Sequence, residues 1–526
     1  MKKNLLFLFL WSAPVLFFAQ QDEAWVYLSD KQNVEASLAD PITILTQKAI
    51  DRKINHGVLI DERDVPVNEN YISQLKIQNG ISVLAKSKWF NAVHVRGSEI
   101  NIKALIGLSF VTSIDFADKS LNLKQVQQKK ESKLETVSTS FIYGNALNQI
   151  QMIKGDQLHV SNYTGTGMTI AILDAGFPNV HVMTSFKRLR DAGHILGDYD
   201  FVNRDDDVYT NNTSSHGTWV LSTMAGYVES KYVGTAPDAS YYLFITEDAV
   251  SENPVEESYW VEAAERADSL GVDVINTSLG YTTYDNPNYS YAYNNMNGTT
   301  AFCSRGANIA FTRGMIVVVS AGNSGNTSNP NISAPADAIN AFTIGAVNSA
   351  RNYASFSSIG PSFDGRIKPD VMAQGQSAVV ATPIGTVATN SGTSFSGPII
   401  AGMVASFWQA FPNLTNARIV QLIKESSDRF SNPNAQYGYG IPNFQLALNN
   451  ALANNQFSTE GFFVYPNPFS EFTNISFNPV SEQSELEIYN VEGKLLDVIC
   501  LVEGQTSAIW SAAQQCGGVY YARLKS

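Results

Sequence analysis

Residues 168–174 read Met-Thr-Ile-Ala-Ile-Leu-Asp, a short apolar run that ends in a carboxylate. A run of this length, rich in β-branched residues, predicts a buried strand. Similar runs follow at 272–279, 315–320 and 342–347, and helical patterns at 255–270 and 299–313 lie between them. Strands that alternate with helices pair in parallel, so the sequence predicts a three-layer α/β domain with a parallel sheet over residues 141–455.

Asp174 directly follows the first of these strands. Open α/β sheets bind their ligands at the carboxyl ends of the strands, so this carboxylate is a candidate functional residue. Taken alone, it is equally an ordinary turn aspartate that caps the next segment.

A histidine and a serine each stand at the start of a predicted helix. His216 opens the stretch that runs to Gly226, and Gly217 would let that helix approach another backbone closely. Ser394 precedes a long apolar helix, and we expect Pro398 in or near its first turn. The free N–H groups there favour a developing oxyanion. Each residue alone could be structural, since an N-cap serine or a lone histidine usually is.

Together the three residues indicate a catalytic role more strongly than each does alone, because they occur along the chain in the order Asp, His, Ser. Serine is a poor nucleophile until a base such as His216 takes its proton, and Asp174 would orient the imidazole. Asn323 follows the strand at 315–320 and could donate a hydrogen bond to the oxyanion, although turn asparagines are common. This set predicts acyl transfer.

The sequence thereby resembles the subtilisin-like serine protease (subtilase) family. The matching segments are Ala171-Ile172-Leu173-Asp174, His216-Gly217-Thr218, Gly271-Val272-Asp273-Val274-Ile275-Asn276, Ser320-Ala321-Gly322-Asn323, Gly365-Arg366-Ile367-Lys368-Pro369-Asp370, Gly392-Thr393-Ser394 and Tyr437-Gly438-Tyr439-Gly440. The resemblance implies a serine endopeptidase with Asp174, His216 and Ser394 as its catalytic triad and Asn323 as the oxyanion donor. It also implies that substrate pairs with Ser278, Leu279 and Gly280 as an added strand. Ala321 and Gly322 are expected to bind substrate as part of the lining of its first pocket.

Two positions depart from the family pattern. Ala175 stands where many relatives carry Ser or Thr, and Gln374 replaces the usual Pro between Ala373 and Gly375. Neither change removes a member of the triad. A catalytically silent binding protein on the same fold, or a serine esterase, remains an alternative function.

Residues 20–118 mix short strands with helical patterns and predict a small α+β domain. The block resembles the N-terminal propeptide of secreted subtilases, which implies that it acts as an inhibitor of its own protease. The alternative is a separate binding domain. Residues 119–140 are polar and read as an exposed linker, and we expect self-cleavage between Gln127 and Ser140.

Residues 461–526 change character to short strands separated by turns that contain Gly and Asn, which predicts a small β-sandwich. The block resembles the C-terminal sorting domain of the type IX secretion system in Bacteroidetes, and this resemblance implies the type IX secretion machinery as a partner. A generic adhesion sandwich is the alternative.

Residues 1–19 begin with Lys2 and Lys3, continue as an apolar run and end in Ala19, which predicts a signal peptide. The alternative is an N-terminal membrane anchor. No later run is long enough to predict a transmembrane span. We therefore expect a secreted protein, extracellular or attached to the outer-membrane surface. A net charge of −13 argues against nucleic acid as a partner. The family resemblance implies protein or peptide substrates.

The three cysteines, Cys303, Cys500 and Cys516, allow one disulfide at most. Cys500 with Cys516 is the local candidate, and unpaired thiols are the alternative. No Cys/His cluster predicts a metal site, and we expect no cofactor. The resemblance allows structural Ca²⁺, whose ligands stay unassigned; Asp205-Asp206-Asp207 is the one acidic run that draws attention.

The stretches expected to line the first pocket, 278–280 and 321–324, hold no acidic residue, so no preference for basic residues is predicted. The Tyr/Asn-rich segment 281–300 would form either part of the cleft rim or a solvated surface loop.

Overall fold

The computed structural model describes residues 21–121, 141–210, 214–455 and 463–525, the last range with gaps at 466–468, 470–471, 478–479, 481–483, 492 and 513–516. The chain divides into two compact units, Met1–Ala451 and Leu452–Ser526. The predicted signal peptide and the predicted self-cleavage region lie outside the described residues, as does Cys516. The proposed pairing of Cys500 with Cys516 therefore stays a prediction.

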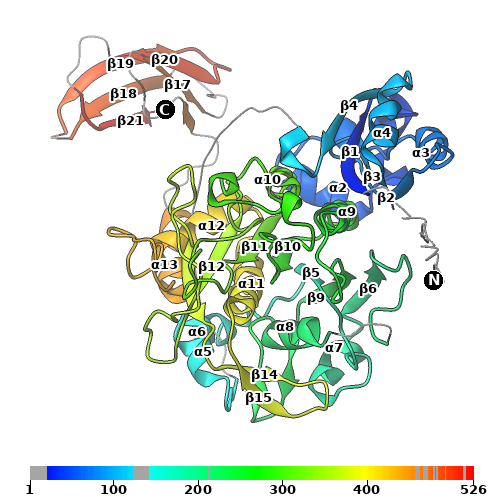
Figure 1. Ribbon diagram of the computed structural model, residues 1–526. Coiled ribbons are helices and arrows are strands. Elements are labelled where there is room, and N and C mark those ends of the chain that lie inside the picture. The colour runs from blue at the N-terminus through cyan, green and yellow to red at the C-terminus, as the bar shows by residue number, and fades with distance from the viewer. Residues whose placement is uncertain are drawn as a thin grey trace, which may run out of the picture. The chain divides into compact units, whose positions relative to one another are not determined.

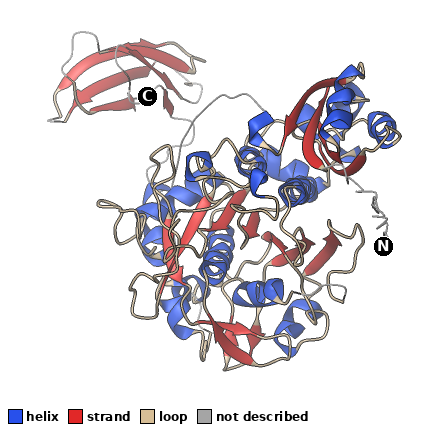
Figure 2. Ribbon diagram, in the orientation of Figure 1, coloured by secondary structure: helices blue, strands red, loops and turns tan. Residues whose placement is uncertain are grey.

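A seven-stranded sheet forms the centre of the first unit, and every neighbouring pair of its strands is parallel (Figures 1 and 2). Its order is β13-β12-β11-β10-β5-β9-β6. The strands are β5 Thr169–Asp174, β6 Ile195–Asp200, β9 Ser240–Ile245, β10 Val274–Thr277, β11 Ile316–Ser320, β12 Phe342–Val347 and β13 Val371–Gln374. The four predicted strands are the adjacent β5, β10, β11 and β12, and β10 is shorter than predicted because the chain leaves the sheet before Ser278.

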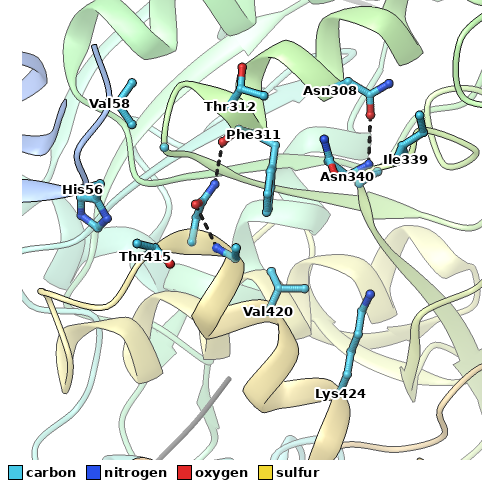
Figure 3. Close-up of a pocket in the computed structure, with 14 residues that line it drawn as sticks. His56, Val58, Asn308, Phe311, Thr312, Ile339, Asn340, Thr415, Val420 and Lys424 are labelled. Atoms are coloured by element: carbon cyan, nitrogen blue, oxygen red, sulfur yellow. Dashed lines mark hydrogen bonds between the residues drawn. The ribbon is translucent and has the colours of Figure 1, made fainter. Parts of the chain in front are cut away.

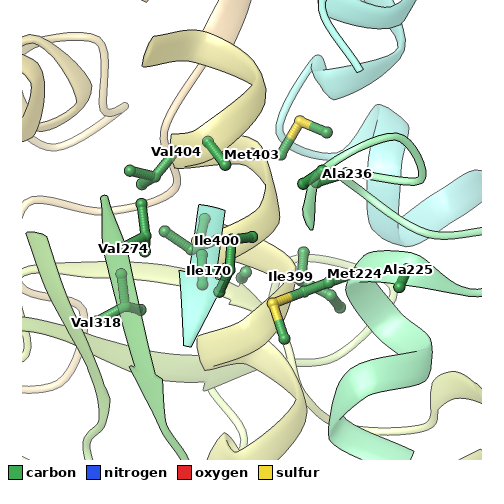
Figure 4. Packing of buried hydrophobic residues seen from close by; sticks show 14 of the residues in the cluster. Ile170, Met224, Ala225, Ala236, Val274, Val318, Ile399, Ile400, Met403 and Val404 are labelled. Atoms are coloured by element: carbon green, nitrogen blue, oxygen red, sulfur yellow. The ribbon is translucent and has the colours of Figure 1, made fainter. Parts of the chain in front are cut away.

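Helices cover both faces of this sheet and complete the predicted three layers. On one face lie α8 His216–Ala225 and α11 Thr393–Gln409, and on the other lie α9 Val255–Leu270 and α10 Phe302–Thr312. The side chains of β5 alternate between the two cores, with Ile170 and Ile172 facing α11 and with Ala171 and Leu173 facing α9. Figure 4 shows Ile170 beside Ile400 of α11 in the first of these cores.

Shorter elements complete the peptidase region. They are α5 Leu147–Gln151, α6 Gly155–His159, α7 Lys187–Asp191, α12 Asn416–Glu425 and α13 Phe444–Asn455, with the antiparallel pairs β7 Tyr227–Val228 with β8 Tyr232–Val233 and β14 Ala378–Ala381 with β15 Val387–Asn390. Single 3₁₀ turns lie at η5 Thr184–Phe186, η6 Pro287–Tyr289 and η7 Tyr293–Asn295.

The N-terminal block folds as the predicted α+β domain. Its antiparallel sheet has the order β2-β3-β1-β4, and helices pack on it around a core that includes Val26, Val93 and Leu75. The elements are β1 Asp22–Leu28, β2 Ser82–Ser87, β3 Ala92–Gly97, β4 Val111–Phe116, α1 Val34–Ala39, α2 Gln47–Asn55, α3 Glu69–Lys76 and α4 Glu99–Ala104, with 3₁₀ turns η1 Pro41–Thr43, η2 Glu62–Asp64, η3 Leu105–Gly107 and η4 Lys119–Leu121.

The C-terminal unit consists of two three-stranded antiparallel sheets, β16-β17-β20 and β19-β18-β21. The strands are β16 Phe463–Tyr465, β17 Phe472–Ser476, β18 Ser484–Asn490, β19 Leu495–Leu501, β20 Ser507–Ser511 and β21 Tyr520–Lys525. Ile475 and Trp510 from one sheet share a core with Leu486 and Ile488 from the other, which makes the unit a small β-sandwich.

Candidate active site

Asp174 is the last residue of β5 and His216 is the first residue of α8, and the two side chains meet. The Nδ1 of His216 lies 2.8 Å from the Oδ1 of Asp174, which also accepts the N–H of Ala175 at 2.8 Å. Asp174 is fully buried. Burial of the imidazole opposes its protonation, but the charge and hydrogen bond of Asp174 outweigh burial and raise the pKa of His216.

Glycine brings the start of α8 against the end of β5. A Cβ added to Gly217 would lie 2.5 Å from the carbonyl oxygen of Gly176, a distance that no real side chain tolerates. The hydroxyl of Thr218 donates to the carbonyl of Pro178 at 2.9 Å and fixes the same contact. The close approach expected from the sequence is therefore present, and it sets the imidazole beside the carboxylate.

Ser394 is the second residue of α11, and its hydroxyl donates to the carbonyl of Ser278 at 3.4 Å. Within the described chain it makes no hydrogen bond to His216. The ring of His216 lies 6.2 Å, centroid to centroid, from the ring of Phe395, which follows Ser394. Ser394 therefore lies on a helix, α11, that packs beside His216. His216 itself is paired with Asp174.

Pro398 lies just beyond the first turn of α11, as its sixth residue, which agrees with the position predicted from the sequence. Proline has no N–H, so the carbonyl four residues earlier loses its helical partner. That carbonyl belongs to Ser394, and the hydroxyl of Ser278 donates to it at 3.1 Å. Ser278, which is predicted to bind substrate, thereby holds the backbone of the predicted nucleophile by a hydrogen bond.

Asn323 lies three residues beyond β11, and its amide is oriented by α11. Its Oδ1 accepts the N–H of Thr393 at 2.8 Å and the hydroxyl of Thr393 at 3.1 Å, so Nδ2 is directed elsewhere. A Cβ built on Gly392 would lie 3.7 Å from that Nδ2 and 3.6 Å from the backbone N of Ser394. Two N–H groups therefore lie beside one small space next to Ser394, which supports the predicted oxyanion role of Asn323.

A cavity of about 280 Å³ opens beside Ser394. Its lining residues are Glu252, Ser278, Leu279, Gly280, Thr282, Thr283, Ser320, Gly322, Asn323, Ser324, Ser333, Thr393 and Ser394. Five of the six predicted residues of the substrate strands and oxyanion donor line it, and Ala321 does not: it is fully buried, and its N–H donates to Ile344 at 2.9 Å. Sequence reasoning missed Glu252 and Ser333, since neither stretch had been assigned to the pocket.

The Tyr/Asn-rich segment 281–300 packs against the rest of the peptidase domain and is not a solvated loop. Tyr284 and Tyr291 are buried and donate to the carboxylate of Glu257, at 2.7 and 2.6 Å. The buried carboxylate needs donors, and these tyrosines supply them. The part of the segment that reaches the cavity is Thr282 and Thr283.

A larger cavity, of about 610 Å³, lies elsewhere (Figure 3). It is bordered by His56 and Val58 of the N-terminal domain and by residues of α10 and α12. Burial lowers the pKa of His56, whose ring packs edge-on against Trp408 at 5.4 Å between centroids. None of the predicted catalytic residues lines this cavity, so we assign it to the junction of the two domains.

The N-terminal domain contacts the peptidase domain through a buried carboxylate on α9. Glu265 accepts the backbone N–H groups of Lys88 and Trp89, each at 2.9 Å, and the hydroxyl of Ser87. Burial raises the pKa of Glu265 to about 7, although these hydrogen bonds oppose the shift. The carboxylate thus caps the turn between β2 and β3.

Buried ion pairs form the second contact between the two domains. Lys53 of α2 is fully buried, and its Nζ lies 2.9 Å from Asp268 of α9 and 3.1 Å from Asp64. Arg52 also pairs with Asp268, and Arg313 of the peptidase domain pairs with Asp64. Burial opposes ionisation of Asp268, but the neighbouring cations outweigh it and hold its pKa at about 2.

The acidic run 205–207 is engaged in local turns. Asp205 accepts the N–H of Asp207 at 3.0 Å, and Asp207 accepts the N–H groups of Tyr209 and Thr210. Across the described ranges, no group of three or more His, Cys, Asp or Glu side chains is arranged to hold a metal ion. The helices that the structure describes include none that is long and apolar enough to cross a bilayer.

Three family models match the chain. They are the subtilase family over residues 165–440, the peptidase S8 propeptide domain of Bacteroidota over 23–134, and the secretion system C-terminal sorting domain over 463–526. The propeptide match extends beyond residue 118 into the predicted linker. These matches leave the exact boundaries of the domains as predictions.

Characterised subtilisins are similar over most of their length. Subtilisin NAT of Bacillus subtilis subsp. natto is 32% identical over 300 residues, which cover 57% of this chain and 70% of that protein. Subtilisin of Bacillus pumilus is 32% identical over 57% of this chain and 97% of its own. M-protease of Shouchella clausii is 26% identical over 72% of this chain and 87% of its own.

The parallel sheet with an Asp–His pair at its carboxyl edge and a serine at a helix start defines the chain as a serine hydrolase of the α/β class. The chain belongs to the subtilase family. It is a secreted or cell-surface serine endopeptidase, made as a zymogen with a propeptide and a type IX sorting domain.

Proposed function

We propose that Asp174, His216 and Ser394 are the catalytic triad and that Asn323 is the oxyanion donor. The observation that carries this assignment is the 2.8 Å contact between His216 and Asp174 at the edge where Ser394 and Asn323 lie. The hydroxyl of Ser394 would leave the carbonyl of Ser278 and rotate to His216 when substrate binds, since catalytic hydrogen bonds often tighten only in the complex.

The reaction follows from these positions. The oxygen of Ser394 attacks the peptide carbonyl while its proton passes to Nε2 of His216. The negative oxygen that forms is held by Nδ2 of Asn323 and by the N–H of Ser394. The C–N bond then breaks, the amine leaves with the proton from His216, and water repeats the cycle on the acyl-enzyme.

The acid–base, nucleophilic and oxyanion roles are all filled by side chains of this chain, so we propose that the reaction uses no cofactor. We further propose that the substrate pairs with Ser278, Leu279 and Gly280 as an added strand, where Leu279 and Gly280 follow the end of β10. A structural Ca²⁺ stays a proposal without ligands, and a fall in melting temperature on chelation would support it.

The propeptide would inhibit the enzyme until self-cleavage within 127–140 releases it. The interface through Glu265 and Asp268 supports this role, because it holds the propeptide against α9 by buried contacts. Protein or peptide substrates and the type IX secretion machinery are the partners that we propose.

Ser394→Ala tests the assignment. The variant should keep the propeptide and lose about 10⁶-fold in turnover, the scale known from subtilisin. A fluorophosphonate probe should label wild-type protein at Ser394 and leave the variant unlabelled. Maturation of the variant without added protease, or labelling at another residue, would refute the triad or its role in self-cleavage.

A further inference from the structure

The walls of the substrate cavity carry a single charge. Of the 13 residues that line it, Glu252 is the one with an ionisable side chain, and most of the others contribute hydroxyl groups or glycine backbone. A cavity of about 280 Å³ with such walls offers little apolar surface to a large aliphatic side chain. It offers hydroxyl acceptors and one carboxylate, which are groups that bind an ammonium or guanidinium.

Glu252 belongs to the segment between β9 and α9, and its backbone is tied to the segment after β10. The N–H of Asp285 donates to the carbonyl of Glu252 at 3.0 Å, and the N–H of Glu252 donates to Oδ2 of Asp285 at 3.2 Å. These two reciprocal hydrogen bonds fix the backbone of Glu252, from which its side chain extends. In the described part of the chain, no hydrogen bond or ion pair engages the Glu252 carboxylate.

The electrostatic surroundings of Glu252 are negative. Burial and the charge of Asp285 both raise the pKa of Glu252. The charge of Glu252 in turn contributes to the raised pKa values of Glu247 and Glu256, which lie on the same side of the domain. A cation that entered this part of the cavity would relieve repulsion between carboxylates as well as gain a partner.

We propose that Glu252 is a specificity-determining residue that makes this protease prefer substrates with Lys or Arg on the acyl side of the cut bond. The inference rests on the proposed function, because it takes the cavity beside Ser394 as the substrate site. Asp285 is a positioning residue that holds the Glu252 backbone and adds to the negative potential. This preference differs from the expectation drawn from the sequence, which took residues 278–280 and 321–324 as the pocket lining and did not include Glu252.

The chain's own linker offers a substrate of the required kind. The stretch that must be cut to release the propeptide contains Lys129, Lys130 and Lys133 within the predicted cleavage region. A carboxylate in the cavity and lysines in the first peptide that the enzyme meets are complementary. We therefore expect a lysine among the four residues that precede the self-cleavage bond.

Peptide hydrolysis by the mature enzyme tests the proposal. Fluorogenic peptides would carry either Lys or its uncharged isostere norleucine at each of the four positions before the cut bond. We expect kcat/KM to be about 3- to 10-fold higher for Lys at one or more positions at low salt. Glu252→Gln should abolish the difference between the Lys and norleucine peptides, and Glu252→Lys should reverse it.

Two controls separate charge recognition from general damage. Glu229→Gln makes the same charge change at an exposed turn outside the cavity lining and should leave the preference intact. Raising the NaCl concentration from 0.05 to about 0.5 M should shrink the preference of the wild type, since salt screens exposed charges.

The outcomes distinguish this inference from the proposed function. If norleucine peptides are hydrolysed and Lys brings no gain, or if the gain survives Glu252→Gln, the role of Glu252 is wrong and the triad assignment stands. If mature wild-type enzyme hydrolyses none of the peptides, the proposed function fails and this inference fails with it.

Discussion

The catalytic edge and the propeptide interface of the same peptidase domain are built from different interactions. At the catalytic edge, hydrogen bonds from Thr393 and Ser278 and close backbone packing at Gly217 hold the reacting groups around a single charged pair, Asp174 with His216. At the propeptide interface, Lys53 and Asp268 are buried ions that neutralise each other across two domains. The edge is complete within one domain, whereas the interface takes its charges from two domains, and Asp268 loses Arg52 and Lys53 when the propeptide leaves.

The difference has an energetic consequence. A buried ion pair repays its desolvation only when the partners are present, so removing one partner leaves a costly charge. Within the peptidase domain, Arg313 Nε lies 3.7 Å from Asp268 Oδ2, so this aspartate keeps one cation after the propeptide leaves. Separation of the propeptide therefore leaves Asp268 with Arg313 as its cation and leaves the contacts of the catalytic edge described above in place.

Asn323→Ala should impair the catalytic edge by removing an uncharged hydrogen-bonding group. The variant loses the Nδ2 donor, and we expect kcat to fall by about 10²- to 10³-fold with little change in KM, because the oxyanion exists only in the transition state. Steady-state hydrolysis of one peptide measures both constants. Asn323→Asp keeps the Oδ1 acceptor for Thr393 and loses the donor, so it should be at least as impaired.

A large KM effect with unchanged kcat in Asn323→Ala would contradict the oxyanion role and leave Asn323 as a substrate-binding residue. If Asn323→Asp retained most of the activity, the amide would matter for orienting Thr393 and not for donating a hydrogen bond.

Lys53→Met should weaken the propeptide interface by removing a buried charge. In the Ser394→Ala background, which prevents processing, we expect the free energy of unfolding to fall by about 3 kcal/mol, since Asp64 and Asp268 lose a shared buried cation. Urea denaturation of the full chain would measure the loss. Lys103→Met is the matched control, because Lys103 pairs with Glu99 on the exposed surface and should change stability by no more than about 0.5 kcal/mol.

Equal stability of the two lysine variants would mean that methionine packing replaces the buried ion pair without cost, as occurs in some proteins. The contrast between the two regions would then be one of geometry and not of energy.

The sequence predicted the residues at the catalytic edge more completely than the residues that line the neighbouring cavity, and the reasons are physical. Asp174 and Asn323 follow short apolar runs, and the carboxyl ends of parallel strands must meet at one edge. Strands β6 and β13 were missed because β6 contains Gly197 and two aspartates and β13 is only four residues long. β9 carries an apolar run, Tyr241 to Ile245, that could have been predicted.

Missing β9 explains why Glu252 was missed. The position of Glu252 depends on the connection from β9 to α9 and on its contact with Asp285, 33 residues away. The rotamer of Ser394 was equally beyond the sequence, because a hydroxyl chooses among nearby acceptors once the fold has brought them together. The hydrophobic pattern of the sequence determines which residues lie at the edge of the sheet. The packing of the folded chain determines how their side-chain atoms are oriented.

The departure at position 175 gives the last and smallest prediction. The Oδ2 of Asp174 is buried, and none of the described residues donates a hydrogen bond to it. His216 must be neutral to accept a proton, so kcat/KM should be full above its raised pKa and fall as the pH drops through that value. Ala175→Thr restores a hydroxyl that can donate to Oδ2, which weakens the hold of Asp174 on the protonated imidazole.

We therefore expect the acid limb of the kcat/KM profile to move to lower pH in Ala175→Thr, by up to about one unit. Ala175→Val has the same shape without the hydroxyl and should keep the wild-type limb. A shift of both variants would show that bulk at this position displaces the Asp–His pair. An unchanged limb in Ala175→Thr would mean that a hydroxyl at position 175 has no influence on the base through the second carboxylate oxygen of Asp174.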